Sequence, residues 1–215
     1  MVRVTLVLLM VIAQGNAIGM LREGAAQLID DVYNNYEKTR PATELEAEHR
    51  KQVALAAQEA LENGITSFQD MGSSFEEVAL LKTMADEGNL PVRLYMAIHD
   101  PTEIMAEKLA EFRMVGYGNN YLTNRCIGEK VLDGALGTHG AWLHESYVDL
   151  PHSSGFNVTP VEEIEKSAAL AVKHGYQMAI QGIGDKATSV LLDIYGQVFK
   201  DNPNQSDWRW RIEHA

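Results

Sequence analysis

From residue 42 onward, segments with a helical pattern of hydrophobic positions alternate with segments that have the pattern of a buried strand. Stretches with apolar residues at helical spacing, ended by Gly or Asn, are followed by short apolar runs typical of buried strands. The predicted helices are 42–63, 74–87, 101–114, 160–174 and 185–199. The predicted strands are 65–70, 92–99, 130–132, 176–182 and 208–214. Helices between successive strands predict parallel pairing and an α/β fold, either part of an α/β barrel or an open doubly wound sheet.

Three helix starts have recognisable capping residues. Ser74 and Asp185 each precede a predicted helix and can accept hydrogen bonds from its first N–H groups. Thr159 is the expected N-cap of the helix that follows, with Pro160 at its first position and Glu162 completing a capping box. These signals fix the expected boundaries between loop and helix.

The N-terminal segment is strongly apolar and has two interpretations. Residues 4–13 contain one polar side chain, Thr5, and are too short to span a bilayer, which predicts no membrane association. A basic residue, an apolar core and small residues up to 17 are typical of a short secretory signal. A β-rich apolar run equally fits a buried strand. We treat residues 1–16 as an uncertain segment of a single domain over 1–215, and expect a cytoplasmic protein unless residues 1–17 direct secretion.

Composition narrows the class of protein. The chain has 215 residues, with 18 basic and 30 acidic side chains and a net charge of −12, which argues against binding to nucleic acid. One cysteine, Cys126, excludes a disulfide scaffold and is interpreted as a small buried apolar residue, with a reactive thiol as the alternative. A closed (β/α)₈ barrel typically needs about 250 residues, so we expect an incomplete barrel.

Carboxylate, imidazole and amide side chains recur where the predicted strands end. In barrel enzymes the reacting groups lie at the carboxyl ends of the strands, and such a set suits a metal site with nitrogen and oxygen ligands or a general acid–base pair. Two of its members could instead be a turn residue (Asp70) and a helix cap (Asp185). The set comprises Gln69, Asp70, His99, Asp100, Lys130, Asp133, Gln181, Asp185, Glu213 and His214.

Three separated motifs resemble the metal-dependent amidohydrolase superfamily, and within it the amidohydrolase-3 branch of YtcJ-like and N-substituted formamide deformylase-like proteins. They are Asp133-Gly-Ala-Leu-Gly-Thr-His-Gly-Ala-Trp142, Gly182-Ile-Gly-Asp-Lys-Ala187 and Trp208-Arg-Trp-Arg-Ile-Glu-His-Ala215. The resemblance runs from about residue 15 to the last residue and favours the strand interpretation of the N-terminal segment. It implies a partial TIM-type (β/α)₈ barrel with about five parallel strands.

The resemblance also implies a divalent metal, zinc by preference, and assigns residues to it. His214 matches a metal histidine of the family, and Lys130 is the candidate for its carboxylated lysine, although the spacing from Lys130 to Asp133 is one residue short. Gln181 stands where the family has a further metal histidine, and an amide is a poorer zinc ligand than an imidazole. Asp133, His139, Gln181 and Asp185 are expected near the substrate.

Two further departures from the family leave two hypotheses open. No His-x-His pair occurs, and we expect that the sequence begins after the first metal strand and stops before the strand with the family's late aspartate. One hypothesis is a hydrolase that uses metal-activated water to cleave non-peptide C–N bonds in a small amide-like substrate. The other is a non-catalytic, truncated remnant or pseudoenzyme that keeps the barrel scaffold and could self-associate through open sheet edges.

Overall fold

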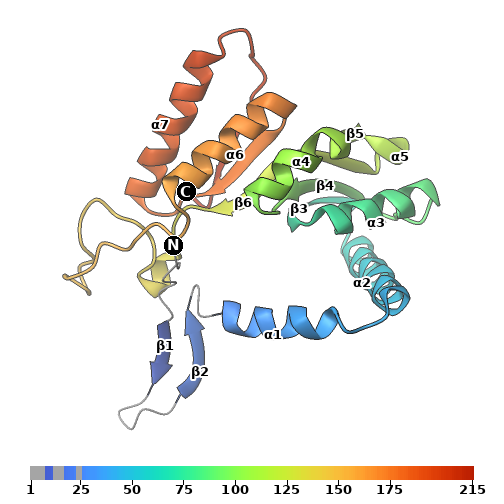
Figure 1. Cartoon of the computed structure of the whole chain (residues 1–215), viewed down its shortest axis with the longest axis horizontal. Helices are drawn as coiled ribbons and strands as arrows, with labels where there is room; N and C mark the ends of the chain where they lie inside the picture. Colours follow the sequence, from blue (N-terminus) through green and yellow to red (C-terminus); the bar gives the residue numbers. More distant parts are fainter. Residues whose placement is uncertain (1–7, 12–16, 23–25) are drawn as a thin grey trace. The chain divides into compact units, whose positions relative to one another are not determined.

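The computed structural model describes residues 8–11, 17–22 and 26–215 (Figure 1). The chain divides into two compact units, Met1–Gln52 and Val53–Ala215, which we describe separately. The expectation of one domain over residues 1–215 stays a prediction.

The first unit contains a β-hairpin and a helix. Strands β1 (Leu8–Val11) and β2 (Ala17–Arg22) pair antiparallel, and helix α1 (Gln27–Glu37) follows. Strand β1 lies inside the apolar segment 4–13, and the remainder of that segment lies outside the described residues, so the buried-strand interpretation stays a prediction. Helix α1 was not predicted, and no capping residue marks its start: Ala26 precedes it without a side-chain hydrogen bond. Its apolar side chains, among them Ile29 and Val32, are exposed.

The second unit is built on a sheet whose strands run parallel in the order β3-β4-β6-β7-β8, with β5 antiparallel to β6. The strands are β3 (Ser67–Ser73), β4 (Arg93–Ile98), β5 (Met114–Gly116), β6 (Leu122–Val131), β7 (Gln177–Gln181) and β8 (Arg211–Glu213). The helices are α2 (Ala42–Glu62, which begins in the first unit), α3 (Phe75–Asp86), α4 (Thr102–Phe112), α5 (Tyr117–Asn120), α6 (Val161–His174) and α7 (Asp185–Asp201). The prediction of an α/β fold with five parallel strands, as in part of a TIM-type barrel, is confirmed.

Helices α3, α4, α6 and α7 pack on one face of the sheet (Figure 1). Successive side chains of a strand point to opposite faces, and the alternate residues Met96 and Ile98 of β4 belong to the same buried cluster as Met178 and Ile180 of β7. This helix-covered core, with a large apolar area removed from water, is the main source of stability.

The opposite face, which we call the inner face, carries smaller and more polar side chains. It is defined by the cluster of Ala97, Cys126 and Ala179, with Met71 and Tyr95 packed against them. Cys126 is fully buried here, and burial raises the pKa of its thiol to about 11. The interpretation of Cys126 as a small buried residue is therefore confirmed.

Strand β6 begins eight residues before the predicted strand 130–132. Its first half was missed because polar residues interrupt the apolar pattern. Asn124 is fully buried, and its side-chain N–H donates to the carbonyl oxygen of Phe112 at 2.9 Å. A buried amide with a backbone partner is compatible with a core strand, but a single sequence does not reveal that partner.

Two of the three predicted caps differ from the structure. Ser74 forms the expected capping box with Glu77. Pro160, rather than Thr159, is the N-cap of α6, because the ψ of Pro160 is extended at 138°, so the helix begins one residue later and Glu162 completes no capping box. Gly184 is the N-cap of α7, and Asp185 is that helix's first residue. No helix in the described ranges is long and apolar enough to cross a membrane.

Candidate functional site

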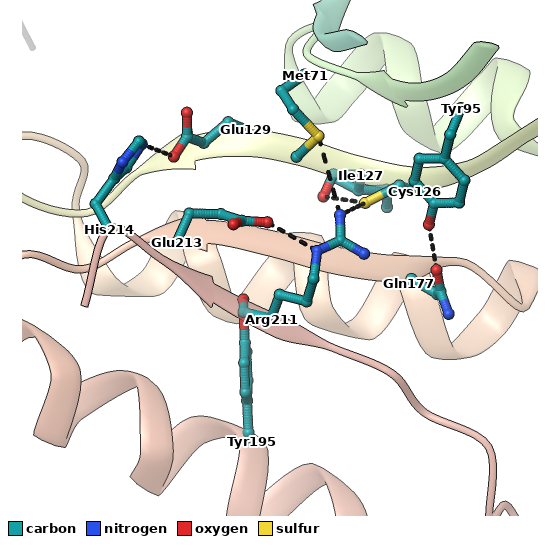
Figure 2. Close-up of polar contacts among 10 residues, drawn as sticks. All are labelled: Met71, Tyr95, Cys126, Ile127, Glu129, Gln177, Tyr195, Arg211, Glu213 and His214. Carbon is teal, nitrogen blue, oxygen red and sulfur yellow. Dashed lines mark hydrogen bonds and ion pairs between the residues drawn. The ribbon is translucent and has the colours of Figure 1, made fainter. Parts of the chain in front are cut away.

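Side chains of β6 and β8 meet where these parallel strands end. Nε2 of His214, directly after β8, lies 2.9 Å from Oε1 of Glu129 near the end of β6 (Figure 2). The Glu129 side chain is 21% exposed and that of His214 is 55% exposed. His214 has a φ of 65°, a left-handed conformation that is uncommon for residues other than glycine. The pair is therefore reachable from solvent through the imidazole.

Glu129 Oε1 is buried and accepts no hydrogen bond. The close approach to His214 lacks the alignment of a hydrogen bond and is an ion pair only when the imidazole is protonated. A buried carboxylate oxygen without a hydrogen bond is costly, and the nearby imidazole of His214 is the partner that the structure gives it.

A β-bulge directs Glu129 to this position. Ile127 is opposite Met178 and Lys130 is opposite Ile180, so Gly128 and Glu129 together face the single residue Ala179. Two residues opposite one bend the strand and re-aim a side chain, a device common beside active sites. Gly128 has a φ of 151°, and a Cβ there would collide with the carbonyl oxygen of Ala179, so glycine is required.

Lys130 is not brought into contact with His214. Its Nζ donates to the carbonyl oxygen of Asp100 at 2.9 Å, and its register partner Ile180 belongs to the helix-covered core. Burial lowers the pKa of the Lys130 ammonium, partly offset by the carboxylates of Asp100 and Glu163. The structure therefore pairs His214 with Glu129, the neighbour of the predicted ligand.

Asp133 is a buried carboxylate that holds three segments together. Oδ1 accepts from the N–H of Ile183 at 3.0 Å, and Oδ2 accepts from those of Gly184 and Trp142, each at 2.8 Å. Its carbonyl oxygen accepts from the side-chain amide of Gln181. Asp133 and Gln181, both predicted near the substrate, thus come together and fix the loops after β6 and β7.

The other two residues predicted near the substrate lie elsewhere on these loops. His139 Nε2 is 3.0 Å from Asp149 Oδ2 in a hydrogen-bonded pair, and its ring meets the Tyr147 ring edge-on. Asp185 Oδ1 accepts from the backbone N–H of His144 at 3.0 Å. Neither side chain contacts Glu129 or His214 in the described contacts.

An arginine occupies the centre of the inner face. Arg211 Nε donates to Glu213 at 2.8 Å, and the guanidinium lies 3.8 Å from Cys126 Sγ and 3.9 Å from Met71 Sδ (Figure 2). It also lies over the Tyr95 ring, at 5.5 Å from the centroid. Sequence reasoning missed this cluster, because it joins side chains from four strands.

A shallow hollow of about 400 Å³ opens beside Arg211 on the inner face. It is lined by Gln69, Tyr95, Gln177, Arg209, Trp210 and Arg211. The Tyr95 hydroxyl donates to the Gln177 side chain within it. Glu129 and His214 do not line this hollow, so it is separate from the strand-end pair.

Glu129 and His214 supply two kinds of donor atom that metal ions use. A carboxylate oxygen and an imidazole nitrogen are both common ligands of Zn²⁺, and Glu129 and His214 bring one of each together. Among the residues that the structure describes, no group of three or more His, Cys, Asp or Glu side chains could hold a metal ion. The pair alone therefore supplies two donors, fewer than the three protein ligands of a catalytic zinc site.

Comparison with known proteins gives consistent matches. Residues 8–215 match the model of a family described as the amidohydrolase family. Protein LONG AFTER FAR-RED 3 of Arabidopsis thaliana is 27% identical over 214 residues, covering 94% of this chain and 34% of that protein. The chain therefore spans about a third of this relative's length.

Two solved structures are also similar. One is an uncharacterized metal-dependent hydrolase from Pyrococcus furiosus, with a TM-score of 0.64 and 25% identity over 85% of this chain and 37% of that one. The other is an uncharacterized metal-dependent hydrolase from Pyrococcus horikoshii OT3, with a TM-score of 0.59 and 26% identity over 71% of this chain and 31% of that one.

Proposed function

This chain belongs to the amidohydrolase family, and from that membership we propose that it acts in the metal-dependent hydrolysis of a non-peptide C–N bond in a small amide- or formamide-type substrate. The observation that carries the proposal is the Glu129–His214 pair at the carboxyl ends of β6 and β8. Barrel enzymes hold their reacting groups at this end of the strands.

The proposed cofactor is a divalent cation, with zinc preferred because its usual ligands include imidazole and carboxylate. A divalent ion held there would supply Lewis-acid chemistry, namely a more acidic bound water and a polarised amide carbonyl. Glu129 and His214 would hold it; Lys130, the ligand that the family resemblance suggests, contacts Asp100 in this structure. A catalytic zinc commonly has three protein ligands, so the described pair is part of a site.

The remaining residues have supporting roles in this proposal. Asp133 keeps the loops after β6 and β7 in fixed positions through its three backbone hydrogen bonds. Those loops carry His139 and Asp185, which we place near the substrate as groups able to bind or orient its polar atoms. Rigid support of this kind is what holds reacting groups in a productive geometry.

A second candidate function is a non-catalytic scaffold. Gln181 favours it, because its amide is engaged with the Asp133 carbonyl at the position where the family has a metal histidine. In that case the parallel sheet, with edge strands β3 and β8, could serve for self-association through strand pairing.

An amidase assay separates these candidates. The purified chain, loaded with Zn²⁺ or Mn²⁺, would be tested on small N-formyl and N-acyl amines by product analysis, beside the variants Glu129→Gln and His214→Gln. Metal-dependent turnover that both substitutions reduce supports the hydrolase. Absence of turnover by the folded, metal-treated chain supports the scaffold.

A further inference from the structure

We draw no further inference here: the strongest candidate, the shallow hollow of about 400 Å³ beside Arg211 on the inner face, carries none, because both of its arginines already pair with neighbouring carboxylates and nothing in the structure shows what covers it.

Discussion

The carboxylate of Asp133 accepts the backbone N–H of Gly184 at 2.8 Å across 51 positions of sequence. Two further N–H groups complete its hydrogen bonds, and the side chain has no exposed surface. Substitution by Asn would replace one acceptor oxygen by an N–H₂ group facing backbone donors. We expect Asp133→Asn to lower the free energy of unfolding by about 2–4 kcal/mol, measured by urea denaturation.

The exposed Asp149 is the control for this prediction. Its side chain is 74% exposed and pairs with His139, so Asp149→Asn should change the free energy of unfolding by less than about 1 kcal/mol. Equal effects of the two substitutions would show that Asp133 does not anchor the loops.

Replacing Gly128 by any residue with a side chain should lower the stability of the protein. A Cβ at this position would collide with the backbone of Ala179, and its φ of 151° is unfavourable for other residues. We expect Gly128→Ala to destabilise the protein by about 2 kcal/mol or more. Gly137→Ala is the matched control, because a Cβ there meets no atom within 4 Å and should leave the melting temperature nearly unchanged.

The stability should fall at high pH because of Cys126. Burial raises the pKa of its thiol from 9.0 to about 11 in the folded protein, so the neutral form is favoured by folding. This contribution is fully present below pH 9 and is lost as the pH rises from about 9 to 11. Chemical denaturation of the native chain and of Cys126→Ala between pH 8 and 11 should show a steeper decline for the native chain; parallel curves would contradict the prediction.

Arg211 and Glu213 should be energetically coupled. Their 2.8 Å contact lies on the inner face with both side chains about 30% exposed (31% and 28%), so the pair is partly screened by solvent. We expect a coupling of about 0.5–1.5 kcal/mol in a double-mutant cycle of Arg211→Met and Glu213→Gln. A second double-mutant cycle, of Lys166→Met and Glu163→Gln on one helix, should give a smaller coupling, because the Lys166 side chain is 60% exposed.

The helices and most strands could be predicted from the sequence because each follows from local periodicity and punctuation. Helix α3 is an example: Ser74 and Glu77 cap it, and its apolar side chains face the core. Strand β6 could be predicted only at its end, because the partner of the buried Asn124 amide is twelve residues away at Phe112. A pattern along one segment does not show such a partner.

The two strand ends that meet at the candidate site could be predicted, whereas the role of Lys130 and His214 as metal ligands stays a prediction. His214 and the end of β6 were both identified, and the structure brings them together. Glu129 contacts His214 and Lys130 does not, because of a bulge opposite Ala179. A one-residue shift in a strand moves a side chain to the other face. The Arg211 cluster was beyond sequence reasoning, because Met71, Cys126 and Arg211 meet only once the strands pair.

The polar pairs of the inner face affect how this side of the sheet meets water. Tyr95 bonds to Gln177 and Arg211 pairs with Glu213, whereas the aliphatic side chains of the same strands point to the helices. A surface whose polar groups are hydrogen-bonded exposes less apolar area and does not promote nonspecific aggregation. Water that reaches this face therefore meets side chains whose hydrogen bonds are already made, around a buried centre of Ala97, Cys126 and Ala179.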